Sequence, residues 1–263
     1  MSYETILTEI RGRVGILTLN RPDTLNALNA QMNQEMRQQF RVWNEDESVG
    51  AIVITGAGRG FCSGADITGF EATARGERRT NLDRQSPTEW QDLCRESKPI
   101  VCAINGVAVG QGITMTLTCD VRVASDAARM SFRFVRIGLT PEFGSTHFLP
   151  HLVGLGRTLE LMLTGKFISA EEALEIGLVN HVYSADTMLD EAAALAQDMA
   201  ANPAWQLQQS KRQIYDHYLE REVPGQVNHT WWDAQAHRAV FEIVHGPVRH
   251  QVEVTSPFLE HCP

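Results

Sequence analysis

Long apolar runs are missing from this sequence, and none approaches the roughly 20 residues that a membrane-spanning helix needs. Basic charge is also scarce, because the 263 residues carry a formal net charge of -9. A nucleic-acid-binding protein usually presents a basic face or stripe. The amino-terminal stretch MSYETILTEIRGRVG lacks the basic head and apolar core of a signal peptide. We therefore expect a cytoplasmic protein with neither a membrane nor a nucleic-acid partner.

Cysteine is too sparse and too scattered for a disulfide framework. The five cysteines are odd in number and widely spaced, and some lie in apolar runs such as IVCAI. Reduced core thiols are the expected state, as in a cytosolic protein. They are Cys62, Cys94, Cys102, Cys119 and Cys262. His147 and His151 are four residues apart, but Pro150 and the lack of a third ligand argue against a metal site, so no metal is predicted.

Short strand patterns alternate with helix patterns along the first part of the chain. TILTEI and VGILTLN alternate at period two around RGR, which predicts an antiparallel hairpin. Residues 30–46 place large apolar side chains at helical spacing, and GAIVITG and PIVCAING are typical of buried strands. RTLELMLTG and SAEEALEIG predict helices that end at glycine, and VNHVY predicts another strand. An α/β fold class follows.

The pattern changes after Val182, since the remaining sequence favours helix and shows no convincing strand. We place a boundary near Asn202 and expect a core of residues 1–201 and a helical region of residues 202–263. Large aromatic side chains are concentrated in that second region. Such side chains pack on a small core or on another subunit. The tail is therefore expected to support oligomerisation.

Two glycine-bearing turns follow predicted strands and are candidates for chemistry. The first runs through Gly64, Ala65 and Asp66, and the second through Gly110 and Gln111 into an apolar helix. Small residues allow close approach to the backbone, and amides at a helix N-terminus favour developing negative charge. By spacing alone the pattern is weak, because tight packing explains many glycine turns. Two such turns are nevertheless able to supply two N–H donors.

The stretch GLTPEFGST contains Glu142 directly after a proline, at what is predicted to be the first turn of a helix. Proline and glutamate both suit a helix N-terminus and its positive dipole. From these residues alone, a capping role is favoured over a catalytic one. Upstream, the polar segment 68–90 fits neither period and is interpreted equally well as a surface loop or as a mobile lid over a site.

Several segments resemble the crotonase, or enoyl-CoA hydratase/isomerase, superfamily. FCSGADI and KPIVCAINGVAVGQGITMTLTCD match its two signature segments, and LNRPDTLNALN, RIGLTPEFGST and LTGKFISAEEALEIGLVNHVY match further ones in order. The resemblance runs from about Leu7 to about Ala201. It implies a spiral of ββα units with a C-terminal helical region used in trimer contacts. The expected assembly is a homo-oligomer, either a trimer or a dimer of trimers.

The resemblance also implies an acyl thioester of coenzyme A as substrate, with no other cofactor. The family holds the thioester oxygen with two backbone amides, whose matching positions here are Ala65 and Gln111. Residues expected to line the substrate are Gly64, Asp66, Gly110, Thr114 and Phe134, although Asp66 is better interpreted as a turn-stabilising carboxylate. The family's usual lysine after the first signature is missing, with Thr68 and Gly69 there instead.

The reaction depends on the carboxylates, because every branch of the superfamily uses the same oxyanion hole. The two glutamates of the hydratases fall on Thr114 and Phe134, neither of which is a general acid or base near neutrality. Isomerases of the superfamily carry an aspartate or glutamate at the position of Glu142. One carboxylate is enough to move a double bond. The resemblance thus favours an acyl-CoA isomerase with Glu142 as acid and base.

Three alternatives stay open. A relative of chlorobenzoyl-CoA dehalogenase would use Glu142 as a nucleophile, although that branch has tryptophan where this chain has Phe134. A non-catalytic CoA-ester binding protein would explain the loss of both hydratase glutamates. A weak or promiscuous enoyl-CoA hydratase is the third.

Overall fold

The computed structural model describes residues 3–66, 89–219, 226–233, 238–245 and 248–255. Contacts divide the chain into two units, Met1–Arg212 and Gln213–Pro263, which we describe separately. The polar segment 68–90, interpreted above as a loop or lid, lies largely outside the described residues. The boundary expected near Asn202 falls inside the first unit.

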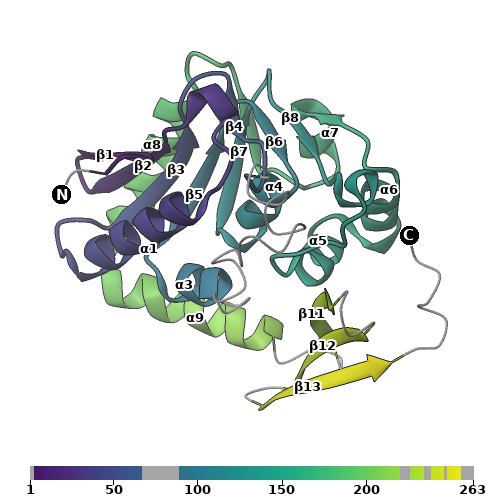
Figure 1. Cartoon of the computed structure of the whole chain (residues 1–263). Helices are drawn as coiled ribbons and strands as arrows, with labels where there is room; N and C mark the ends of the chain where they lie inside the picture. The colour runs from purple at the N-terminus through teal and green to yellow at the C-terminus, as the bar shows by residue number, and fades with distance from the viewer. Residues whose placement is uncertain (1–2, 67–88, 220–225, 234–237, 246–247, 256–263) are drawn as a thin grey trace. The chain divides into compact units, whose positions relative to one another are not determined.

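The first unit is built from two sheets that the chain visits in turn (Figure 1). The larger sheet has the order β1-β2-β3-β5-β7-β10 and the smaller sheet the order β4-β6-β8-β9. The strands of the larger sheet are β1 (Ile6–Arg11), β2 (Val14–Leu19), β3 (Ala51–Gly56), β5 (Ile100–Ile104), β7 (Val121–Ser125) and β10 (His181–Tyr183). Those of the smaller sheet are β4 (Gly60–Cys62), β6 (Val107–Val109), β8 (Arg129–Ser131) and β9 (Ile168–Ser169).

A repeated two-strand unit generates this arrangement. Strands β3, β5 and β7 are parallel neighbours in the larger sheet, and each is followed directly by β4, β6 or β8 in the smaller one. Each pair leads into helical structure: α3 (Glu89–Glu96), then α4 (Gln111–Thr114) with η4 (Met115–Thr118), then η5 (Phe134–Ile137). The repeat places the carboxyl ends of β4, β6 and β8 next to one another.

Both faces of the larger sheet are buried over its central strands β2, β3, β5 and β7. On one face, small and β-branched side chains pack against α8 (Met188–Ala200), whose Ala192, Ala196 and Ala200 allow close approach. On the other face, Leu17, Ile54 and their neighbours form one core with α1 (Ala30–Glu45). Alternate residues of each strand point to opposite faces. The short apolar strand segments of the sequence thus supply both cores.

Most of the predicted elements are confirmed. The hairpin β1–β2 turns at Gly12, whose φ of 59° suits glycine. Helix α6 (Leu155–Thr164) ends at Gly165 in the left-handed conformation, and α7 (Ala170–Glu175) begins where Ser169 accepts a hydrogen bond from the Glu172 amide. The remaining helical segments of this unit are α5 (Ser145–Val153) and η1 (Pro22–Thr24).

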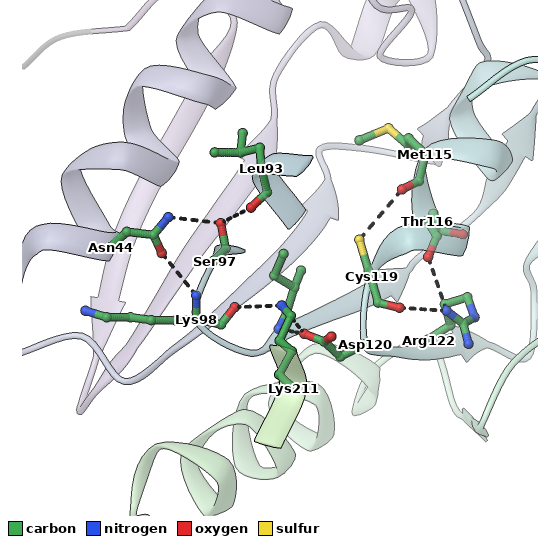
Figure 2. Close-up of polar contacts among 11 residues, drawn as sticks. Asn44, Leu93, Ser97, Lys98, Met115, Thr116, Cys119, Asp120, Arg122 and Lys211 are labelled. Carbon is green, nitrogen blue, oxygen red and sulfur yellow. Dashed lines mark hydrogen bonds and ion pairs between the residues drawn. The ribbon is translucent and has the colours of Figure 1, made fainter. Parts of the chain in front are cut away.

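Helix α9 (Ala204–Leu219) is fixed to the core by a buried charge pair, shown in Figure 2. Lys211 Nζ lies 2.8 Å from Asp120 Oδ2, and the same carboxylate oxygen accepts the Ile100 N–H at 2.7 Å. Lys211 is 8% exposed. Asp120, which precedes β7, therefore holds α9 and β5 together.

The prediction that residues 202–263 are helical throughout is wrong for the described residues after α9. They form a three-stranded antiparallel sheet of β11 (Gln226–Asp233), β12 (Arg238–His245) and β13 (Val248–Thr255). Segments such as VRHQVEVT are rich in valine, whose branched Cβ favours strand over helix. The prediction was wrong because the helical pattern of α8 and α9 was extended to the residues that follow α9.

Four of the cysteines lie in the described part of the chain, and all four are buried free thiols. Burial raises the pKa of the Cys62 thiol to about 12. The expected reduced core thiols are thus confirmed for Cys62, Cys94, Cys102 and Cys119, whereas Cys262 lies outside the described residues. Among the described helices, none combines the length and the apolar character needed to cross a bilayer.

Candidate active site

The two glycine-bearing turns meet because they follow neighbouring parallel strands. Strand β4 pairs with β6, with Cys62 opposite Ala108. Gly64 has φ 105°, and a Cβ there would lie 2.9 Å from Val109 O and 3.6 Å from Gln111 N. Any larger residue at Gly64 would clash with backbone, so glycine is required for this close approach.

Two backbone amides at this junction are available as donors. Among the hydrogen bonds of the described residues, neither the Ala65 N–H nor the Gln111 N–H has an acceptor. Gln111 is the first residue of α4, where an N–H has no partner within the helix. Within the described residues the two N–H groups thus have no acceptor, and their use as a pair of donors stays a prediction.

Backbone hydrogen bonds to the segment before α1 fix the conformation of the Ala65 turn. The Leu28 N–H donates to Gly64 O at 2.8 Å, and the Asp66 N–H donates to Leu28 O at 2.9 Å. The Asp66 carboxylate lies 2.8 Å from Arg21 Nη2. Asp66 therefore stabilises the turn that presents the Ala65 amide, as its interpretation as a turn residue requires.

Thr114 lies at the end of α4 with its hydroxyl turned back onto its own helix. The residue is fully buried, and Oγ1 donates to Gln111 O at 3.4 Å. The side chain at this position is thus part of the support for the Gln111 amide. It offers neither a proton acceptor of suitable pKa nor a carboxylate.

After the third strand, β8, an aromatic side chain, that of Phe134, lies next to the Gly110 turn. The Gly110 N–H donates to Ser131 O at the end of β8, at 3.0 Å. Phe134, which begins η5, is 4% exposed, and its Cε1 would lie 3.9 Å from a Cβ at Gly110. The Phe134 ring therefore borders the turn that carries Gln111. The chain continues from η5 to Glu142.

Glu142 lies before α5 and not in its first turn, so the predicted helix start is wrong by three residues or more. The helix begins at Ser145 because Phe143 and Gly144 adopt left-handed φ values of 54° and 66°. A phenylalanine in this conformation is strained, and such strain concentrates at functional sites. Two consecutive left-handed residues thus fix the direction of the chain directly after Glu142.

The Glu142 carboxyl group does not cap the helix. The N-cap of α5 is Gly144, without a side-chain hydrogen bond, and within the described residues the Glu142 carboxyl group has no hydrogen-bond or ion-pair partner. Burial is the cause that raises its pKa to about 7, from an ordinary value of 4.5. A half-buried carboxyl group with this pKa is able both to accept and to return a proton near neutrality.

Two polar residues near Glu142 were missed by the sequence analysis. Gln91 lies on α3, at the end of the aperiodic segment, and Ser145 is the first residue of α5. Nothing in their local sequence marks them. Only the fold reveals their place, because a Cβ at Gly144 would lie 2.6 Å from Gln91 Nε2.

His147 and His151 both lie on α5, with ring centroids 4.8 Å apart. His151 Nδ1 is 2.8 Å from the carbonyl oxygen of His147. Within the described part of the chain, no group of three or more candidate ligands is placed to hold a metal ion.

Comparisons with known proteins agree with this geometry. The family model described as "Enoyl-CoA hydratase/isomerase" matches residues 9–242. This chain belongs to the enoyl-CoA hydratase/isomerase family. It is 36% identical over 210 residues to a probable enoyl-CoA hydratase of Rhizobium meliloti, covering 76% of this chain and 77% of that one. It is 34% identical over 214 residues to the 1,2-epoxyphenylacetyl-CoA isomerase of Escherichia coli, covering 80% and 82%.

Solved structures of the family have the same fold. An enoyl-CoA hydratase/isomerase from Pseudoalteromonas atlantica superposes with a TM-score of 0.74 at 33% identity, covering 82% of this chain and 85% of the other. The spiral of ββα units expected from the resemblance is thereby confirmed, and so is membership of the crotonase superfamily. The names of the relatives include hydratases and an isomerase, which leaves the reaction to be argued from the site.

Proposed function

We propose that this protein is an acyl-CoA isomerase that moves a carbon–carbon double bond, for example from a 3-enoyl-CoA to a 2-enoyl-CoA or in a related ring acyl-CoA. The observation that carries the proposal concerns three groups that have no partner among the described residues: the amides of Ala65 and Gln111, and the carboxyl group of Glu142, whose pKa is about 7. This set provides an oxyanion hole and a single group for proton transfer.

In the first step, the ionised Glu142 carboxylate takes a proton from C2 of the substrate. The electrons of that C–H bond form a C1–C2 double bond, and the thioester oxygen becomes negative. The amides of Ala65 and Gln111 donate to that oxygen, and they stabilise the dienolate more than the neutral thioester. This difference lowers the barrier.

In the second step, protonated Glu142 returns its proton to C4. The C3–C4 double bond supplies the electrons for the new C4–H bond, the C2–C3 double bond forms, and the carbonyl is restored. A pKa of about 7 suits this exchange, because the group has to act as base and acid in one turnover.

Hydration is the second candidate, favoured by the names of the relatives in Rhizobium meliloti and other organisms. Against it, the two positions of the hydratase glutamates hold Thr114, whose hydroxyl donates to Gln111 O, and buried Phe134. A water molecule activated by a single carboxyl group would add slowly to a 2-enoyl thioester.

Two further roles remain alternatives for Glu142. A nucleophilic carboxylate would attack the acyl group and form an ester, as in the dehalogenase branch. A binding protein would leave the carboxyl group without any chemical role. The raised pKa of Glu142 supports neither alternative. A nucleophilic carboxylate works in its ionised form, which burial disfavours, and a carboxyl group without a chemical role does not require burial.

The proposal is tested with two straight-chain substrates, 3-hexenoyl-CoA and 2-hexenoyl-CoA. We expect 3-hexenoyl-CoA to be converted to 2-hexenoyl-CoA, with kcat/KM at least ten times larger than that for water addition to 2-hexenoyl-CoA. Absorbance of the conjugated thioester follows the first reaction, and chromatography of the 3-hydroxy product follows the second. Faster hydration than isomerisation would contradict the proposal.

A homo-oligomer, as a trimer or a dimer of trimers, is part of the proposal. In support, Leu155, Leu159 and Leu163 are spaced four residues apart on α6 and are 66%, 47% and 68% exposed. A stripe of this kind is typical of a surface that another chain covers.

A further inference from the structure

Two polar side-chain atoms close to Glu142 are buried without a hydrogen-bond partner. Among the described residues, Gln91 Oε1 and Ser145 Oγ have this property, and Ser145 is 0% exposed. A buried polar atom left unpaired destabilises the fold, because it has lost its hydrogen bonds to water without replacing them. Native proteins contain few such atoms, and most of them have a function or a missing partner to explain them.

Both residues lie at the turn that carries Glu142: Ser145 follows it in the sequence, and Gln91 reaches it from α3. The Ser145 N–H donates to Glu142 O at 3.0 Å. Gly144 lies between Glu142 and Ser145 in the sequence. A Cβ at Gly144 would lie 2.6 Å from Gln91 Nε2 and 3.1 Å from Phe148 Cε2. The side-chain amide of Gln91 and the ring of Phe148 thus both pack against Gly144. Within the part of the chain that the structure describes, Gln91 Oε1, the Glu142 carboxyl group and Ser145 Oγ thus have no partner and lie at one turn.

Helix α3 connects this turn to the oxyanion hole. Trp90 Nε1 donates to Met115 O at 3.0 Å, and Met115 directly follows the helix that Gln111 begins. Gln91, the next residue along α3, contacts Gly144 on the other side. Helix α3 therefore contacts both the segment that follows Gln111 and the turn that carries Glu142.

A single hydroxyl group of a ligand has the donor and the acceptor that these two unpaired atoms need. A glutamine oxygen accepts a hydrogen bond, and a serine hydroxyl both donates and accepts. A ligand hydroxyl donates to the first and accepts from the second. It fits equally well if the amide turns over and presents its nitrogen, because a hydroxyl is donor and acceptor at once.

We infer that Gln91 and Ser145 form a hydroxyl-binding notch, and that the preferred substrates are acyl thioesters with a hydroxyl group beyond the reacting carbons. The inference deepens the proposed function and rests on it for the placement of the acyl chain. Glu142 has to reach C4, and Ser145 lies in the same turn, with its N–H 3.0 Å from Glu142 O, so the hydroxyl group is expected a short way along the acyl chain beyond C4. The hydroxyl is therefore expected on C5 or C6.

The test compares hexanoyl-CoA with 5-hydroxyhexanoyl-CoA and 6-hydroxyhexanoyl-CoA by titration calorimetry, which requires no turnover. One of the two hydroxylated thioesters is expected to bind the wild type roughly 10–100-fold more tightly than hexanoyl-CoA, because hexanoyl-CoA leaves both polar atoms unpaired. Ser145→Ala and Gln91→Met should each reduce that preference to less than about threefold. Thr146→Ala, a change at the exposed neighbour of Ser145, should preserve it.

Equal binding of all three thioesters by the wild type would overturn the inference and would indicate that a water molecule occupies the notch. A preference that survives in both Ser145→Ala and Gln91→Met would also overturn it. If hexanoyl-CoA binds and 3-hexenoyl-CoA is isomerised without a preference, the notch fails while the proposed function stands. If no acyl-CoA binds, both fail together.

Discussion

Replacing Glu142 by glutamine is expected to lower kcat/KM for isomerisation of a 3-enoyl-CoA by a factor of roughly 10²–10⁴, the range that a positioned acid or base contributes. Glutamine keeps the size of the side chain and removes the titratable group. The dissociation constant for a saturated acyl-CoA should change less than about threefold, since the amides of Ala65 and Gln111 are untouched. Steady-state kinetics and calorimetry measure the two quantities.

The wild-type enzyme supplies an internal check through its pH profile. Because burial places the pKa of Glu142 at about 7, kcat/KM for proton removal should rise with pH up to about 7 and then level off. Glu175→Gln changes an exposed glutamate and should leave both the rate and the profile unchanged. A Glu142→Gln variant that folds normally and retains wild-type turnover would contradict a catalytic role.

The same Glu142→Gln variant is expected to gain stability, which separates catalysis from helix capping. A carboxyl group whose pKa is higher in the folded state binds more protons there than in the unfolded chain, so ionisation destabilises the fold. This cost is absent below about pH 4.5 and complete above about pH 7. After allowance for partial exposure, we expect a gain of about 1–3 kcal/mol at pH 8 and almost none at pH 4.

Denaturant unfolding at the two pH values measures this difference. A capping glutamate would show the opposite sign, because the loss of a cap costs about 0.5–2 kcal/mol. A variant that is less stable than the wild type at pH 8 would therefore support capping.

Replacing Gln111 by proline is expected to lower kcat/KM by at least a factor of roughly 10²–10³, the cost of one oxyanion-hole donor. Proline is tolerated at the first position of a helix, where the N–H has no helical partner. The preceding Gly110 has φ 54° and ψ -122°, the mirror image of the extended conformation that residues before proline adopt. The fold is thus expected to survive the loss of the donor.

Gln111→Ala is the matched control, since it removes the buried side chain and retains the amide N–H. It should keep kcat/KM within about tenfold of the wild type. Circular dichroism of both variants checks that α4 and its surroundings are intact. Equal rates for Gln111→Pro and Gln111→Ala in folded protein would exclude the Gln111 amide from the oxyanion hole.

Local sequence was enough to predict five strands of the larger sheet, β1, β2, β3, β5 and β10, and the two glycine-bearing turns. The apolar runs ending at Gly56 and Asn105 are short and strongly patterned, and glycine at positions 64 and 110 has a clear conformational reason. What the pattern did not reveal was that the two turns meet, because this follows from the parallel pairing of β4 with β6. The resemblance to a family supplied that step in advance.

The start of α5 and the C-terminal sheet show why the remainder was not predictable. Proline and glutamate at 141 and 142 are ordinary helix-starting residues, and a left-handed phenylalanine at 143 is too unusual to expect from sequence. Gln91 and Ser145 carry no motif, since their significance depends on partners that they lack in three dimensions. In the C-terminal region, the prediction gave the helical propensity near α9 more weight than the valine-rich segments that follow it.

The central claim is that Glu142 moves a proton within the acyl chain, and isotope transfer tests it most directly. The wild-type enzyme is incubated with 3-hexenoyl-CoA in heavy water and, separately, with C2-deuterated 3-hexenoyl-CoA in ordinary water, and the products are analysed by mass spectrometry and NMR. The account predicts deuterium at C4 of the 2-enoyl product in at least one of the two reactions, with the Glu142 peptide unmodified. Absence of deuterium at C4 in both reactions, or an acyl adduct on the Glu142 peptide, would contradict it.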